Sequence, residues 1–227
     1  MQVEAVEDVL PLGFKRLNDV LDAAARQAVI DKLAALPAGS AGQRDLLDLP
    51  WCCDLSQRLR RLPEVQACLP AGAVAVQCTL FEKSPDRNWL VPPHQDLAIP
   101  VAHRVEHPQL RGWSVKEGRH FVLAPAEVLD QVLGLRLHLD DAAQADGGLR
   151  FIPGSHRAGV LDEREAALWR QRVGEVSADA HAGDVLLMRP LALHASSKAT
   201  AMGRRRVLHF VFGPAELPFG LQWPAVA

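Results

Sequence analysis

The sequence predicts a mainly β fold with flanking α-helices, built as an antiparallel sandwich or barrel of the jelly-roll type. From Ala73 onward, short β-rich runs alternate with segments that contain proline and glycine. No long helical pattern separates these runs, which argues against a doubly wound parallel sheet. At 227 residues the chain is long enough for one substantial core and too short for two comfortable domains. We expect a single domain over residues 1–227, with a helical part at about 1–70 and a jelly-roll core at about 73–213.

Two helices are expected before the strands. Apolar residues recur close to helical period over Leu17–Leu36, and the segment Pro37–Ser40 ends the pattern. A second, short helix fits Asp54–Arg61, with Asp54 as its cap and Pro63 as its stop. Neither helix carries residues that suggest chemistry.

The expected strands are Val74–Glu82, Val132–Asp140, Leu149–Ile152, Asp184–Met188 and Arg206–Phe212. In Leu133–Asp141 every second residue from Leu135 to Leu139 is leucine and the residues between them are polar, which is the pattern of a half-buried strand. Two facing sheets of such strands leave an open mouth, where residues from distant positions can converge on a metal.

Three residues have the composition of a metal site. His94-Gln95-Asp96 supplies an imidazole and a carboxylate that point the same way if they lie on a strand. His194 supplies a second imidazole, and Arg205 follows it by eleven residues. Two histidines and one carboxylate occupy one face of an Fe(II) octahedron and leave the other positions open, as in non-haem iron oxygenases. The open positions can take a 2-oxo acid and dioxygen.

A second pair with the same spacing is His138-Leu139-Asp140. We interpret this pair as the polar face of its strand, ending in the turn Asp140–Gly148, and not as a metal site. The remaining histidines of the core receive structural interpretations as well: His156 follows a Pro-Gly-Ser turn, and His181 and His209 have no partner at ligand spacing.

Other segments accompany the metal residues in a fixed order. They are Phe81-Glu82-Lys83-Ser84-Pro85-Asp86, Asp146-Gly147-Gly148-Leu149-Arg150-Phe151-Ile152-Pro153-Gly154-Ser155-His156, Gly183-Asp184-Val185-Leu186-Leu187-Met188, His194-Ala195-Ser196 and Gly203-Arg204-Arg205-Arg206. Together they closely resemble the phytanoyl-CoA dioxygenase family of Fe(II)/2-oxoglutarate oxygenases, over roughly Val74 to Phe212. The resemblance implies a double-stranded β-helix that uses Fe(II), 2-oxoglutarate as cosubstrate, and dioxygen.

The resemblance also implies roles for individual residues. The iron ligands, which are the catalytic centre, would be His94, Asp96 and His194. The residues around the cosubstrate would be Arg205 and Ser196 at its far carboxylate and, more loosely, Arg136 and Thr79 along its pocket. Family members usually have an aromatic or apolar residue at the position of Arg136. This departure leaves open whether Arg136 contacts 2-oxoglutarate, the substrate or neither.

Strand geometry and the resemblance also predict where other side chains near the expected site point. On a strand Arg205 points away from the side chains of Arg204 and Arg206, so we expect those two to face solvent. Lys83 matches a lysine common in the family and either reaches an acidic group near the mouth or begins the turn that follows it. Gln77 shares a strand face with Thr79 and is a candidate substrate contact.

The insert Ala98–Pro125 follows the first ligand pair and holds Trp113 among proline, glycine and charged residues. A loop of this length inside a compact domain is usually functional or disordered. We expect a long loop that acts as a lid, with Trp113 as a candidate substrate contact. The histidines of the insert, His103, His107 and His120, are expected to be solvated.

Composition limits the partners and the compartment. The 25 basic and 27 acidic residues give a formal charge of −2, which favours neither nucleic acid nor an anionic membrane as a partner. No stretch of eighteen apolar residues is present, the first residues are acidic, and the four cysteines form no recognisable frame. We expect a cytoplasmic protein, and the oligomeric state stays open.

The expected activity is that of a dioxygenase that hydroxylates an unactivated C–H bond of a small molecule and releases succinate and CO2. Halogenating relatives replace the carboxylate at the position of Asp96 with a small residue, so Asp96 favours hydroxylation. Two alternatives remain open. One is the same chemistry on a protein side chain or nucleobase, and the other is a jelly-roll binding protein without catalysis.

Overall fold

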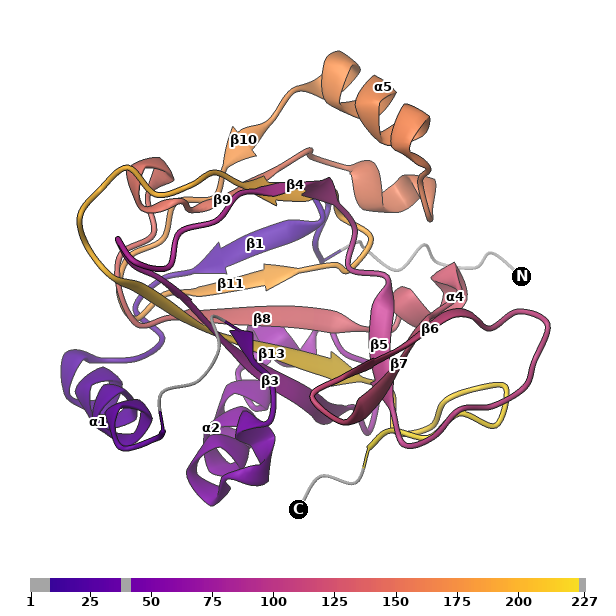
Figure 1. Cartoon of the computed structure of the whole chain (residues 1–227), viewed down its shortest axis with the longest axis horizontal. Helices are drawn as coiled ribbons and strands as arrows, with labels where there is room; N and C mark the ends of the chain where they lie inside the picture. The colour runs from indigo at the N-terminus through magenta and orange to yellow at the C-terminus, as the bar shows by residue number, and fades with distance from the viewer. Residues whose placement is uncertain (1–8, 38–41, 225–227) are drawn as a thin grey trace.

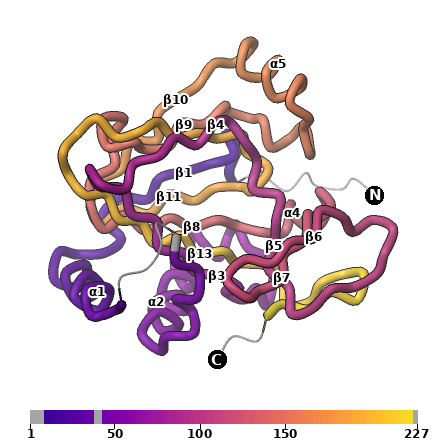
Figure 2. The backbone as a smooth tube through the Cα atoms, in the orientation of Figure 1, coloured from indigo at the N-terminus to yellow at the C-terminus, as the bar shows by residue number. Residues whose placement is uncertain are grey.

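The structure is a computed structural model, and it describes residues 9–37 and 42–224 (Figures 1 and 2). The strands are β1 (Phe14–Leu17), β2 (Gly42–Gln43), β3 (Val74–Lys83), β4 (Val91–His94), β5 (Ala98–Val101), β6 (Arg111–Lys116), β7 (Arg119–Leu123), β8 (Leu133–His138), β9 (Leu149–Phe151), β10 (Val176–Ser177), β11 (Val185–Met188), β12 (His194–Ser196) and β13 (Arg205–Gly213). The helices are α1 (Ala23–Ala34), α2 (Pro50–Arg60), α3 (Pro63–Gln66), α4 (Ala126–Leu129) and α5 (Glu163–Val173).

Two antiparallel sheets face each other in the described residues. The larger has the strand order β1-β11-β8-β13-β3-β2 and the smaller the order β10-β9-β12-β4. Figure 1 shows the smaller sheet above the larger one, with α1 and α2 below the larger sheet. This arrangement confirms the expected mainly β fold of double-stranded β-helix type with flanking helices. Each of the five strands expected from sequence is present, with its ends shifted by at most two residues.

The larger sheet is buried on both faces, which corrects the half-buried pattern expected for β8. Leu135 and Leu137 point away from the smaller sheet into a cluster that includes Leu33 of α1 and Leu59 of α2. Arg136 and His138 point the other way, between the two sheets, and are 7% and 2% exposed. Polar residues on this face therefore line the interior of the fold and not its surface.

Both expected helices differ from their sequence patterns. The first begins at Ala23, because Phe14–Leu17 forms strand β1 and pairs with β11 along the register Leu17↔Val185. Asp22 caps it by accepting a hydrogen bond from the Ala25 backbone amide at 2.8 Å. The second helix begins at Pro50, which occupies the first turn, so Asp54 lies inside the helix and is not its cap.

The insert expected to be a long loop is mostly a separate three-stranded sheet with the order β5-β7-β6. Glu117 and Gly118, with φ of 51° and 76°, form the tight turn between β6 and β7. Its apolar side chains form a small core of their own with α4 and Leu221. No helix within residues 9–37 and 42–224 is long and apolar enough to cross a membrane.

Candidate active site

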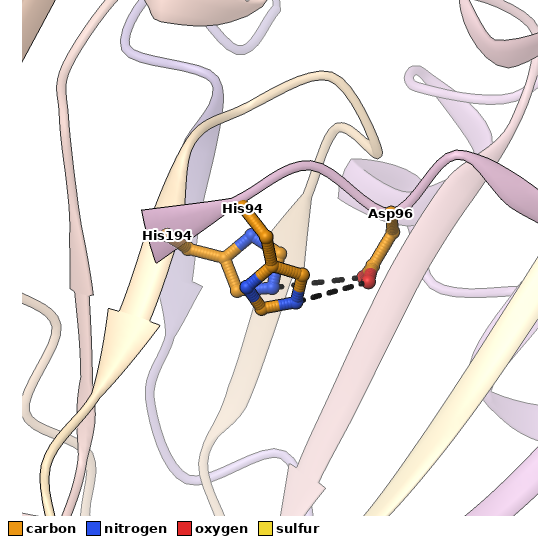
Figure 3. Close-up of side chains that lie close together, drawn as sticks. All are labelled: His94, Asp96 and His194. Atoms are coloured by element: carbon orange, nitrogen blue, oxygen red, sulfur yellow. Dashed lines mark ion pairs between the residues drawn. The ribbon is translucent and has the colours of Figure 1, made fainter. Parts of the chain in front are cut away.

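His94, Asp96 and His194 converge between the two sheets (Figure 3). His94 ends β4 and His194 begins β12, and the two residues are paired across these antiparallel strands. One ligand atom from each of the three residues lies within 4.8 Å of the other two. The Asp96 carboxylate oxygens lie 3.5 Å from His94 Nε2 and 3.7 Å from His194 Nε2. A single metal ion fits among these three ligand atoms.

Asp96 lies beyond the end of β4, so simple strand alternation is not what aims it. Its backbone amide donates to the Pro190 carbonyl at 2.8 Å. Gln95 fixes the turn further, because its Nε2 donates to the Leu191 carbonyl at 2.7 Å and its Oε1 accepts from the Leu161 amide at 2.8 Å. The role of Gln95 was not expected from sequence.

Hydrogen bonds orient both imidazoles for metal binding. Nδ1 of His94 lies 2.9 Å from the Pro92 carbonyl, and Nδ1 of His194 lies 2.9 Å from the Ala192 carbonyl. Because a carbonyl only accepts, each Nδ1 carries a proton, which leaves Nε2 as the atom that can offer a lone pair to a metal. Burial would lower the pKa of His94, but its hydrogen bond with Asp96 raises it. Burial lowers the pKa of His194 to about 4, so this ring is neutral at pH 7. Desolvation would raise the pKa of Asp96, but His194 and a hydrogen bond with His94 hold it well below its usual range. A neutral imidazole and an ionised carboxylate are the forms that bind a metal.

A cavity of about 480 Å³ opens beside these residues. Besides the three metal candidates, the sequence-predicted residues that line it are Gln77, Lys83, Arg136, Ser196 and Arg205. Thr79 and Trp113 are not among the lining residues. Thr79 is fully buried and accepts a hydrogen bond from Gln77 Nε2 at 2.8 Å. Trp113 packs under the Arg104 guanidinium within the core of the insert.

One end of the cavity is cationic. Arg205 and Lys83 are neighbours across β13 and β3, and they are 4% and 1% exposed. The Lys83 ammonium donates to the Ser196 hydroxyl at 3.0 Å and to the Ser197 carbonyl at 2.6 Å. Burial, together with Arg205 and Arg136, lowers the pKa of Lys83 to about 8. Lys83 therefore lies inside the cavity wall, and within the part of the chain that the structure describes it forms no ion pair with an acidic group, so the first of its two expected roles is not seen.

The three consecutive arginines have three different environments. Arg205 donates to the Gly147 carbonyl at 2.7 Å, and its Nε has no partner in the structure. Arg204 is exposed, as expected, and pairs with Glu82 at 3.0 Å. Arg206 corrects the expectation of a solvent-facing side chain, because it makes two hydrogen bonds of 2.8 Å with the Asp140 carboxylate and is largely covered.

His138 and Asp140 do not form a second metal site. Asp140 is held by Arg206, and His138 points between the sheets beside Arg136 and Arg205. Burial, followed by these two cations, lowers the pKa of His138 to about 3. The interpretation of the pair as non-ligating agrees with this geometry, although His138 is buried and not on an exposed polar face.

His209 and Phe81 also line the cavity, and neither was expected there. His209 lies four residues after Arg205 on β13, and Phe81 two residues before Lys83 on β3. Side chains at even spacing share a strand face, so alternation counted from Arg205 and Lys83 would have placed both.

The insert covers the cavity and is tied down at its tip. Ile99, Phe121 and Leu123 of its sheet line the cavity. Arg44 donates to Glu117 at 2.7 Å, and Arg119 pairs with Asp48. These two ion pairs, which we call the latch, connect the β6–β7 turn to the segment before α2.

Comparisons with known proteins agree with this geometry. The family model described as Phytanoyl-CoA dioxygenase (PhyH) matches residues 15–207. A search of curated proteins gave no match. Among solved structures, HygX from Streptomyces hygroscopicus with nickel and 2-oxoglutarate bound is 18% identical, with a TM-score of 0.63 over 90% of this chain and 84% of that one. EctD from S. alaskensis, in its apoform, is 19% identical, with a TM-score of 0.69 over 100% and 83%. SnoK, a non-heme alpha ketoglutarate dependent carbocyclase from nogalamycin biosynthesis, is 16% identical, with a TM-score of 0.65 over 95% and 85%. At these identities the solved structures show a shared fold.

Proposed function

Since the chain belongs to the phytanoyl-CoA dioxygenase family of 2-oxoglutarate-dependent dioxygenases, we propose that it hydroxylates an unactivated C–H bond of a small molecule with Fe(II), 2-oxoglutarate and dioxygen. The observation that carries the proposal is one cavity with the His94, Asp96 and His194 ligand set at its side and Arg205 with Lys83 at its end. A binding protein without catalysis has no need of both features.

The residues around the cavity fit both an iron ion and 2-oxoglutarate. His94, Asp96 and His194 would hold the iron through two neutral imidazoles and one carboxylate. Nitrogens of Arg136, Arg205 and His209 are buried around the cavity without hydrogen-bond partners among residues 9–37 and 42–224, which favours an anion rich in oxygen atoms as the ligand. A dicarboxylate supplies such oxygens. When bound, the iron and the 2-oxo acid supply the oxidising chemistry, and the chain supplies placement and dryness.

The chain's own residues then have distinct tasks. Arg205 would pair with the far carboxylate of 2-oxoglutarate, assisted by Ser196 and Lys83, which bond to each other in the same wall. The planar guanidinium suits a carboxylate better than an ammonium does. Asp96 would be a carboxylate ligand at the position where halogenating relatives have a small residue, which supports hydroxylation over halogenation.

A small molecule fits better than a macromolecule. A cavity of about 480 Å³ lies within the range of small-molecule sites and is covered by the latched insert. HygX, with a similar fold, has been crystallised with hygromycin B bound. The net charge of −2 gives no support to a nucleic-acid substrate. Substrate identity and the position of oxidation stay open.

We also propose that residues 1–227 form one domain and work in the cytoplasm. The helices and the larger sheet share one apolar cluster, which contains Leu33, Leu59 and Phe210. The cysteines, all of which lie in the described ranges, form no disulfide, as expected in a reducing compartment.

The insert should act as a lid that excludes water from the reacting centre. Replacing Glu117 and Arg119 together by Gln removes both ion pairs of the latch, each worth about 0.2–1 kcal/mol at an exposed position. We expect amide hydrogen exchange across Arg111–Leu123 to become a few-fold faster, while affinities for iron and 2-oxoglutarate stay unchanged. Unchanged exchange in this segment would show that the latch does not hold the lid.

A succinate assay tests the proposed function. Purified protein with Fe(II), 2-oxoglutarate and dioxygen should release succinate in an iron-dependent manner, slowly without substrate and faster with it. Screening metabolites for the 2-oxoglutarate-dependent gain of one oxygen atom then identifies the substrate. Absence of any succinate above that of the iron-free control, across such a screen, would refute the function.

A further inference from the structure

We infer that Arg136 binds a carboxylate of the substrate, so that the enzyme acts on small acids with an apolar body. This inference rests on the proposed function and adds the substrate class to it. It starts from a charged side chain that the fold buries, aims into the cavity and leaves without a partner.

Arg136 lies on the cavity face of β8 and is 7% exposed. Its guanidinium makes no hydrogen bond or ion pair with the described residues, and its Nε is buried without a partner. Its guanidinium lies over the Phe81 ring, whose centroid is 5.4 Å from Cζ, and after burial and the repulsion from Arg205 it feels the attraction of the Asp96 carboxylate, with which it forms no ion pair. A ring face does not satisfy the N–H donors in the guanidinium plane, so these donors are available to a ligand. Such a buried unpaired cation is costly unless an anion joins it.

The far carboxylate of 2-oxoglutarate has its own site. Arg205, Lys83 and Ser196 occupy one end of the cavity, where the first two are paired across strands. Arg136 instead pairs across strands with His209, four residues further along β13 than Arg205. At the rise of a β-strand this separates the two arginine backbones by roughly 13 Å along the strand. The two arginines therefore enter the cavity from different points of its wall, although their guanidinium groups lie close enough that the charge of Arg205, after burial, lowers the pKa of Arg136.

The charges that would meet in the cavity also leave Arg136 available for a second anion. An iron ion, the Asp96 carboxylate and the near carboxylate of the cosubstrate sum to zero, and the far carboxylate faces Arg205 and Lys83. Arg44, also in the wall, is paired with Glu117. Arg136 is left without a counterion after the cosubstrate is placed. One guanidinium charge matches the single charge of a carboxylate, whereas a phosphate monoester brings about −1.5 to −2.

The surroundings of Arg136 define the rest of the ligand. The cavity also has a large apolar lining, which includes Leu97, Ile99, Phe121, Leu129, Val132 and Met188. The other cation of the lid in this lining, Lys116, lies over the Phe121 ring. Apolar surface of this kind stabilises a hydrocarbon body, while the guanidinium fixes its orientation. The expected substrate is therefore a monocarboxylic acid whose apolar part lies under the lid.

Paired ligands test the inference directly. The probes are octanoate, cyclohexanecarboxylate, phenylacetate and N-acetyl-leucine, each matched with its primary amide, which has the same shape and no charge. Binding is measured by calorimetry to protein loaded with Ni(II) and 2-oxoglutarate. We expect at least one acid to bind about tenfold or more tightly than its amide in the wild type. Arg136→Met should remove this preference, Arg136→Lys should retain part of it, and the exposed control Arg204→Met should retain all of it.

The affinity for 2-oxoglutarate separates the outcomes. In Arg136→Met it should stay within about threefold of the wild type. A loss as large as that of Arg205→Met would show that Arg136 serves the cosubstrate, and equal binding of every acid and its amide to the wild type would also overturn the inference. If Arg136→Met does not fold, Arg136→Lys and the wild-type pairs decide alone. Failure of the wild type to bind Ni(II) and 2-oxoglutarate would refute the proposed function instead.

Discussion

Replacing His194 by Ala is expected to abolish iron retention and 2-oxoglutarate turnover together. The substitution removes one of three ligands and leaves His94 and Asp96, which lie 3.5 Å apart, as a two-ligand site. Two ligands do not hold a labile divalent ion well, and no other acidic or histidine side chain of the described residues joins this group. Metal content after desalting, measured by atomic emission, should fall from about one iron per chain to near zero.

His138→Gln is the matched control for this prediction. His138 is also a buried histidine in an H-x-D sequence, but its ring points beside Arg136 and Arg205 and not into the ligand set. Its iron content should equal that of the wild type. Iron retained by His194→Ala, or lost from folded His138→Gln, would mean that the wrong pair had been assigned to the metal.

Replacing Arg205 by Ala is expected to weaken 2-oxoglutarate binding by about two to four orders of magnitude. Removing one partner of a buried charge pair leaves the other charge unpaired, which costs roughly 3–5 kcal/mol. Arg205 is 4% exposed, and water does not readily replace it. Calorimetric titration of the metal-loaded protein with 2-oxoglutarate measures the change.

Two variants show whether this loss is specific. Arg204→Ala removes an exposed arginine whose partner is Glu82, and it should leave the affinity unchanged. Arg205→Lys should restore only part of it, because an ammonium cannot form two parallel bonds to one carboxylate. A comparable loss in Arg204→Ala would show that the far carboxylate is not bound where we propose.

Alternating patterns predicted the strands of the core well, because hydrophobic period two is a local property of the sequence. They failed where distant pairing decides the structure. Leu17 was expected to begin the first helix, yet it ends strand β1 because β11, about 170 residues later, pairs with Phe14–Leu17. Similarly, the polar face of β8 is buried because the smaller sheet covers it, which the spacing of Leu135 and Leu137 does not reveal.

In the candidate site, too, residues with a distinctive local pattern could be predicted from sequence, and contacts between distant segments could not. The two histidines and Asp96 could be found from sequence because their residue types and order are distinctive. The partner of Arg206 could not be found, since Asp140 lies 66 residues earlier and meets it only across neighbouring strands. The insert was expected to be a loop because of its length and its proline, glycine and charged residues. Its hairpin turn, Glu117-Gly118, also lacks the asparagine or aspartate that more often precedes glycine in such turns.

The most direct test of the proposed active site is a crystal structure of the protein grown anaerobically with Fe(II) and 2-oxoglutarate, with anomalous diffraction recorded at the iron edge. We expect one iron peak among His94 Nε2, His194 Nε2 and the Asp96 carboxylate, and the far carboxylate of 2-oxoglutarate against Arg205. An iron peak at His138, or 2-oxoglutarate bound away from Arg205, would contradict the assignment.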